Sequence, residues 1–305
     1  MMKILDFDGL APEEFLNRDI RAEEDVSAAV DGILADVRSR GDAALREYTR
    51  RFDGAELRDL QVTAAEFDAA REAVDPCFLE TLREAAENIR RFHERQKHND
   101  FFLTRGSGVV MGQRWTPIER VGICVPRSPE AFPSTILMNA IPAQIAGVQD
   151  IVIVTPPRKD GTVSPEALMA AELAEVTDVF KAGGAQAVAA LAYGTETVPR
   201  VDKIVGPGGV FVATAKRKVF GLVDIDMIAG PSEILVLADG KTDPKWAAAD
   251  LLSQAEHDVL ASAVLVTDSR ALAEAVRAEV EVQLEALPRR DIARRSIEDN
   301  GKIIV

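Results

Sequence analysis

Cysteine is scarce in this chain of 305 residues, which contains only Cys77 and Cys124. The two cysteines form neither a CxxC pair nor a disulfide ladder. A chain of this length buries roughly three quarters of its unfolded surface, so it needs neither disulfides nor a metal simply to fold. These considerations predict a reduced, cytoplasmic setting.

The chain also has fewer basic than acidic residues, and it lacks long apolar runs. Lys and Arg together number 36 against 50 Asp and Glu, which gives a net charge of −14. An acidic chain repels phosphate backbones, so we expect no nucleic-acid partner. No apolar run approaches the ~18 residues of a membrane span, and Asp6 and Asp8 lie where a signal peptide would be apolar. The hydrophobic content of 47% excludes wholesale disorder.

The first third of the chain has a helical pattern. Residues 26–40 carry apolar side chains at helical spacing, and Gly41 follows them as a helix-ending residue would. His93 and His98 lie in a later amphipathic stretch but are five positions apart, which is not the spacing of a same-face ligand pair. Both histidines are expected to be solvated surface residues.

Helix starts in this region carry the side chains that cap helices. Thr63 and Glu66 have the spacing of a capping box before a short helix. Asp75 and Pro76 suit the N-cap and first position of a longer helix, which we expect to reach about Lys97.

From about residue 120 onward, short β-rich runs alternate with helical patterns. Strands are expected at 121–125, 151–155, 179–182, 203–205, 234–238 and 263–267. Helices are expected at 134–147, 165–175, 185–193, 210–219, 244–257 and 270–286. This alternation predicts βαβ units, a mostly parallel sheet and helices on both faces.

Glycine-rich stretches occur at 183–186, 206–209 and 230–232, and we expect them to lie at the carboxyl ends of strands. Ligands of parallel sheets bind at the carboxyl ends of the strands, and a glycine turn before a helix suits an anion or a nucleotide phosphate. Each stretch also fits a tight strand-to-helix turn that binds nothing. None matches the GxGxxG fingerprint, so an ordinary dinucleotide-binding half is not indicated.

The segment 253–258, SQAEHD, closes one of the expected helices. Asp250, Gln254 and His257 share one face of that helix, because they are four and three positions apart. An imidazole nitrogen and an amide oxygen could bind a divalent cation such as zinc. A solvated polar face ending in a histidine explains the same spacing. Two ligands are also fewer than the three of a usual catalytic zinc.

Several longer motifs resemble those of the histidinol dehydrogenase family. The resemblance lies in GGAQAVAALAYGTETVPRVDKIVGPG, VATAKRKVFG, VDIDMIAGPSEILVLAD and WAAADLLSQAEHD, with support from RGDAALREYTRRFD, FHERQ, RVGICVP and PSTILMNAIPAQIAGV. These motifs extend over essentially the whole chain. SQAEHD and IAGPSE are the most specific of them.

The resemblance implies an enzyme of histidine biosynthesis. Family members oxidise L-histidinol through the aldehyde to L-histidine, a four-electron reaction that uses NAD and zinc. They are homodimers in which each active site borrows residues from the partner subunit. Zinc could hold the amine and imidazole nitrogens of the substrate and so position the alcohol carbon for hydride transfer.

The resemblance also assigns roles to individual residues. Gln254 and His257 match two zinc ligands that also contact substrate, and Ser232 matches a substrate-binding serine. Gln186 matches a contact to NAD. Cys124 and Gly209 occupy positions where the family usually has a tyrosine and an asparagine that contact NAD. Arg127-Ser128 stand where the family usually has two glycines.

Members of the family are longer than this chain, which ends at Val305. The family's catalytic Glu-His pair and its other two zinc ligands are therefore expected beyond Val305. Three functions stay open: an enzyme of this family seen in part, a catalytically incompetent truncated or diverged member, and a related zinc alcohol dehydrogenase that acts on another small diol.

The expected fold is of the α/β class, with a helical N-terminal region and two Rossmann-like, incompletely doubly wound domains. Residues 1–19 are expected to form an arm. Residues 20–120 and 233–305 are expected to form one discontinuous and incomplete domain, and residues 121–232 the nucleotide-side domain.

Overall fold

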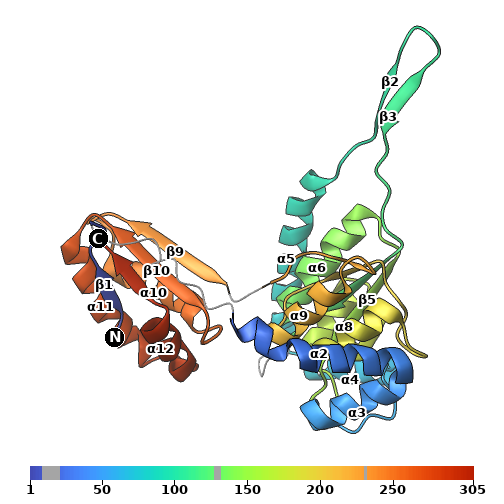
Figure 1. Cartoon of the computed structure of the whole chain (residues 1–305), viewed down its shortest axis with the longest axis horizontal. Coiled ribbons are helices and arrows are strands. Elements are labelled where there is room, and N and C mark those ends of the chain that lie inside the picture. The colour runs from blue at the N-terminus through green and yellow to red at the C-terminus, as the bar shows by residue number, and fades with distance from the viewer. Residues whose placement is uncertain (9–20, 127–131, 230–231) are drawn as a thin grey trace. The chain divides into compact units, whose positions relative to one another are not determined.

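The structure is a computed structural model that describes residues 1–8, 21–126, 132–229 and 232–305 (Figure 1). The chain divides into two compact units. Unit 1 comprises Met1–Ile20 with Ala229–Val305, and unit 2 comprises Arg21–Ile228. Both units have a parallel sheet covered by helices, so the expected α/β class with a helical N-terminal region is confirmed.

Unit 2 contains a five-stranded sheet in the order β6-β5-β4-β7-β8, and every neighbouring pair is parallel. Its strands are β4 (Arg120–Cys124), β5 (Asp150–Thr155), β6 (Val179–Lys181), β7 (Lys203–Val205) and β8 (Asp224–Ile225). Four of them lie within one residue of the expected positions. β8 has only two residues, which is too short to produce a recognisable sequence pattern.

Helices cover both faces of this sheet because its strands are apolar on both sides. Along β5, Val152 and Val154 face one core, whereas Ile151 and Ile153 face the other. The first core includes residues of α2 (Arg21–Arg40), α3 (Asp42–Asp53), α8 (Gly184–Tyr193) and α9 (Val210–Val219). The second includes residues of α4 (Ala64–Ala73), α5 (Pro76–His93), α6 (Pro133–Ala146) and α7 (Pro165–Leu173).

The expected helix starts at Thr63 and Asp75 are confirmed. Thr63 Oγ1 accepts a hydrogen bond from the Glu66 N–H at 3.3 Å, and Glu66 Oε2 accepts one from the Thr63 N–H at 2.8 Å. Asp75 Oδ1 accepts a hydrogen bond from the Cys77 N–H at 2.7 Å. Glu66 also accepts a bond from the buried ammonium of Lys181 at 3.0 Å, which ties the start of α4 to the end of β6.

Glu66 should make the stability of unit 2 depend on acidity. Burial raises the pKa of its carboxyl, but hydrogen bonds from Thr63 and Lys181 outweigh burial and lower that pKa below its usual 4.5. A carboxyl with a lowered folded-state pKa stabilises the fold above its unfolded pKa, and the stabilisation is lost as the pH falls through the folded value. Glu66→Gln should cost about 2 kcal/mol at pH 7 and flatten the decline in stability below pH 4.5.

Urea unfolding between pH 7 and pH 3 would measure this effect. Glu80→Gln, a change to an exposed carboxyl on α5, is the matched control and should leave the curve unchanged. Equal pH profiles for the Glu66 variant and the unsubstituted chain would contradict the prediction.

A β-hairpin that was not predicted extends from the end of α5, beyond the short helix η1 (Glu94–Gln96) (Figure 1). It consists of β2 (Phe101–Thr104) and β3 (Val110–Gln113), which pair antiparallel. Every residue of both strands is exposed. The hairpin therefore presents apolar side chains on both of its faces.

Unit 1 contains a four-stranded parallel sheet in the order β1-β11-β10-β9. Its strands are β1 (Lys3–Leu5), β9 (Glu233–Ala238), β10 (Ser262–Thr267) and β11 (Lys302–Ile304), and its helices are α10 (Pro244–Ala255), α11 (Arg270–Leu284) and α12 (Arg290–Asp299). The helices share one core with the sheet, in which Leu265 is fully buried. Alternate residues of β9, Leu235 and Leu237, are exposed.

The observed units differ from the expected domains. The helices of 21–93 cover the sheet of unit 2, because their apolar faces pack in its two cores, and they do not accompany residues 233–305. The expected arm also contains β1, whose residues pair in register with β11. Whether the units are independent folding domains stays a prediction.

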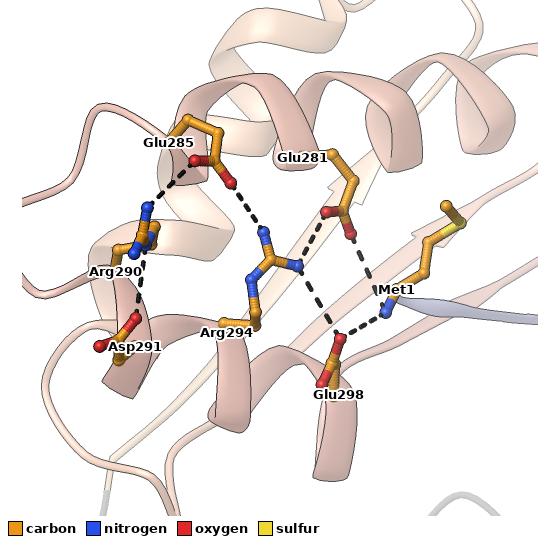
Figure 2. A network of polar contacts seen from close by, with 7 residues as sticks. All are labelled: Met1, Glu281, Glu285, Arg290, Asp291, Arg294 and Glu298. Atoms are coloured by element: carbon orange, nitrogen blue, oxygen red, sulfur yellow. Dashed lines mark hydrogen bonds and ion pairs between the residues drawn. The ribbon is translucent and has the colours of Figure 1, made fainter.

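A partly exposed ion-pair network joins α11 and α12 of unit 1 (Figure 2). The Arg294 guanidinium contacts Glu281 at 3.0 Å and Glu285 at 3.1 Å. The amino group of Met1 lies 3.0 Å from Glu298, so the network also ties down the start of β1. A single ion pair near the surface contributes little to the free energy of folding. Several pairs that share the same charged groups contribute more.

Among the residues that the structure describes, no helix is long and apolar enough to cross a membrane.

Candidate functional site

The carboxyl edge of the five-stranded sheet gathers the residues expected to contact NAD. Cys124 ends β4, Gln186 follows the glycine turn after β6, and Gly209 follows the turn after β7. Because the strands are parallel, these positions lie at one edge of unit 2. The structure thus confirms that two of the three glycine stretches occupy carboxyl strand ends.

Gln186 lies in the first turn of α8 and is 2% exposed. The Gln186 amide atoms are not among the buried side-chain atoms of the described residues that lack a hydrogen-bond partner. Gly184, at φ +69°, brings the backbone close to this amide, and a Cβ there would lie 2.8 Å from Gln186 Oε1. The glycine turn after β6 therefore packs directly against the Gln186 side chain.

Gly206 is held on both sides by one ion pair, between a buried lysine and a partly exposed aspartate. Its N–H donates to Asp226 Oδ2 at 2.8 Å, and its carbonyl accepts from Lys216 Nζ at 2.9 Å. Lys216 Nζ also donates to Asp226 Oδ1, which accepts the Met227 N–H at 2.6 Å as well. Lys216 is 1% exposed, so an ammonium group lies in the interior directly beneath the glycine turn.

Cys124 belongs to the apolar core that lies beside this ion pair. Burial raises the pKa of its thiol to about 12, Lys216 acts in the opposite direction, and Asp226 adds to the rise. The thiol is therefore neutral at physiological pH and packs as a small apolar group. Whether Cys124 contacts a cofactor stays a prediction.

Gly209 is the N-cap of α9 and is exposed. Its φ of −67° is open to any residue, and a Cβ added there would have nothing within 4 Å among the described residues. An asparagine side chain would therefore fit at this position without strain.

The residues expected to bind substrate and zinc lie in unit 1. Ser232 directly precedes β9, while Gln254 and His257 lie at the end of α10 and precede β10. β9 and β10 are parallel, with Ser262 beside Glu233, so all three residues occupy the amino edge of the sheet. The expectation that the glycine stretch 230–232 lies at a carboxyl edge is wrong for Ser232, because the chain changes sheets between β8 and β9.

The end of α10 has the predicted division into two faces. Ala248, Leu251, Leu252 and Ala255 are buried, whereas Asp250 and His257 are exposed and Gln254 is half-buried. Arg289 donates a hydrogen bond to the His257 carbonyl at 3.1 Å, which fixes the backbone here. The histidine ring is left facing solvent.

The described residues do not bring together three His, Cys, Asp or Glu side chains that could hold a metal ion. Gln254 and His257 have suitable oxygen and nitrogen donors, but two ligands do not complete a zinc site. His98 is exposed as expected and stacks on Trp115, whereas His93 is half-buried and lies 2.6 Å from Gln96 Oε1.

Three charged residues that form ion pairs in unit 2 were not predicted from the sequence: Lys216, Asp226 and Lys181. Lys216 shares the buried face of α9 with Ala213 and Val219, so a lysine at an apolar helix position was the available signal. Arg127-Ser128 and Gly230-Pro231 lie outside the described residues.

Comparison with known proteins gives consistent matches. The family model described as histidinol dehydrogenase matches residues 16–305. A histidinol dehydrogenase of Halalkalibacterium halodurans is 56% identical over 291 residues, covering 95% of this chain and 69% of the relative. One from Geobacillus kaustophilus is 58% identical over 282 residues, covering 92% of this chain and 66% of the relative.

A crystal structure of histidinol dehydrogenase from Elizabethkingia anophelis is also similar. It is 37% identical with a TM-score of 0.92, and the match covers 100% of this chain and 71% of that one. The chain thus spans about 70% of the length of such relatives.

Proposed function

Since the chain belongs to the histidinol dehydrogenase family, an oxidoreductase family of histidine biosynthesis, we propose that it takes part in the oxidation of L-histidinol to L-histidine. The proposal includes the aldehyde as intermediate, NAD as oxidant and zinc as the metal. We also propose that the two units are Rossmann-like halves of one enzyme. The cytoplasmic location stays a prediction.

The grouping of Gln186 and two glycine turns at one carboxyl edge of the parallel sheet is the observation that carries the cofactor proposal. Gln186 lies against the first of these turns, where a Cβ on Gly184 would be 2.8 Å from Gln186 Oε1. The turn at Gly206–Gly209 lies at the same sheet edge, and it leads into α9, whose N-terminal amides suit a phosphate. NAD, when bound there, would accept the hydride.

Ser232, Gln254 and His257 are proposed to bind the substrate, and the last two are proposed to ligate zinc. Their placement at one sheet edge supports a shared site. Among the described residues, the donor set does not complete a metal site. The work assigned to these side chains is to bind and orient the small polar substrate.

Replacing Gln186 tests the cofactor site directly. Gln186→Met keeps the volume of the side chain but removes its amide, and loss of one neutral hydrogen bond weakens binding by about 2- to 13-fold. Calorimetric titration of NAD into the protein would measure the change. Gln149→Met, an exposed glutamine of unit 2, is the control and should bind NAD as the unsubstituted chain does.

Turnover and zinc content separate the alternative functions. NADH formation with L-histidinol but not with other small diols supports the proposal, and the reverse preference favours a related diol dehydrogenase. NAD binding without turnover favours the incompetent family member. His257→Ala should lower retained zinc without unfolding the protein, and unchanged zinc would remove His257 from the ligand set.

The exposed hairpin supports a homodimer. Phe101, Phe102, Leu103, Val110 and Met111 are all exposed on two strands that would be marginal alone. Residues 95–114 contain four basic residues and one acidic residue, in a chain with a net charge of −14. A basic, apolar arm is complementary to the acidic surface of a second copy of the same chain.

A charge placed on this hairpin should separate the two copies. We expect the unsubstituted chain to sediment as a dimer and Phe102→Asp to raise the dissociation constant at least tenfold, since ~2 kcal/mol is typical of a central apolar contact. Analytical ultracentrifugation would measure this. Phe220→Asp is the matched control, because Phe220 is 62% exposed and Phe102 is 63% exposed. A monomeric unsubstituted chain, or a Phe102 variant with an unchanged dissociation constant, would contradict the prediction.

A further inference from the structure

Three strand ends of unit 2 meet at the pair Lys216–Asp226, in which the lysine is buried and the Asp226 side chain is 29% exposed. Asp226 follows β8, Gly206 follows β7, and Cys124 ends β4. A Cβ on Gly206 would lie 2.3 Å from the carbonyl oxygen of Cys124, so the turn after β7 packs directly on the end of β4. The ion pair occupies the remaining side of the same turn.

Lys216 and Asp226 fill the space beside the turn, and their hydrogen bonds also fix the orientation of the Gly206 backbone. Both backbone polar groups of Gly206 are used, the N–H by Asp226 and the carbonyl by Lys216. The second oxygen of Asp226 binds Lys216 and the Met227 N–H, so the segment after β8 is held by the same carboxylate. An apolar pair of equal volume would fill this space but would leave these backbone groups without partners.

Burying an ammonium is costly even when it is paired, so such a pair is a poor device for stability alone. Among the described residues, Lys181 and Glu66 form a second pair with a buried lysine, and that pair holds the N-terminus of α4. Lys216 and Asp226 instead hold the turn that starts α9. The two pairs are similar in chemistry but differ in what they hold.

We propose that Lys216 and Asp226 are positioning residues that preset the turn Gly206–Gly209 for the cofactor. They do not contact the cofactor; they orient the backbone that does. This inference rests on the proposed binding of NAD at the carboxyl edge of the sheet. It assigns a role to two side chains that the cofactor proposal itself leaves unused.

The test is Lys216→Met, which removes the ammonium and leaves Asp226 partly solvated with both of its N–H donors. We expect the dissociation constant of NAD to rise about tenfold, as misplacement of a binding group does. Amide exchange in the peptide 203–212 should also become faster. Glu66→Gln is the matched control, because it breaks the other pair that contains a buried lysine while leaving the turn untouched.

If Lys216 only stabilised the fold, Lys216→Met and Glu66→Gln would both lower the unfolding temperature, and the two variants would bind NAD with equal affinity. Equal affinities in Lys216→Met and Glu66→Gln, each measured well below unfolding, would therefore overturn the inference. A tenfold loss confined to Lys216→Met would support it. If the unsubstituted chain binds no NAD, the cofactor proposal fails first and the inference falls with it.

Discussion

Gly206→Ala is expected to lower the free energy of unfolding of unit 2 by about 3–5 kcal/mol. Gly206 has a φ of +101°, where an L-residue is strained. The added methyl group would lie 2.3 Å from the carbonyl oxygen of Cys124, and this oxygen belongs to backbone at the end of a central strand. Relieving this contact would require the strand or the turn to shift, and a shift of the turn would break the two hydrogen bonds that hold Gly206.

Chemical denaturation monitored by circular dichroism would measure the change. Gly209→Ala, three residues later, is the control, because its φ is −67° and no described atom lies near its Cβ position. We expect that variant to stay within about 0.5 kcal/mol of the unsubstituted chain. Similar losses for the two alanine variants would show that the turn relaxes more easily than the packing indicates.

Asp226→Asn is expected to destabilise unit 2 by about 3 kcal/mol, since it leaves the Lys216 ammonium buried without a counter-charge. Asparagine also has only one acceptor oxygen, whereas the carboxylate serves Lys216, Gly206 and Met227. At least one of these three donors would lose its partner.

The double variant Lys216→Met, Asp226→Asn makes this prediction specific. Removing the ammonium as well removes the uncompensated charge, so the double variant should be more stable than Asp226→Asn alone. Urea denaturation of the two single variants and the double variant completes the cycle. Additive losses would mean that Lys216 and Asp226 do not interact strongly in solution.

Local patterns in the sequence predicted most of the secondary structure. The helix starts at Thr63 and Asp75 follow from side chains that bond to backbone a few positions away, and the strands of unit 2 follow from short apolar runs. The same reasoning placed Gln186 and Gly209 after strands, which their parallel arrangement then brought to one edge. These features are local, so they do not depend on the path of the chain.

Features that depend on distant contacts were not predictable in the same way. The pair Lys216–Asp226 forms because β7 and β8 are neighbours, and β8 is too short to recognise. The helices of 21–93 are amphipathic, but their apolar faces do not specify which sheet they cover. The hairpin was missed because its strands have no buried face and therefore no clear alternation.

The pairing of β1 with β11 means that the sheet of unit 1 cannot be completed until β11 has been synthesised. Lys3 lies beside Lys302 in a parallel pair, although about 300 residues separate them along the chain. At roughly 5–20 residues per second, the ribosome delivers the second strand some 15–60 s after the first. All of unit 2 is synthesised within that interval, so unit 2 can fold while β1 is still unpaired. β1 is thus secured in the sheet only after β11 has been made.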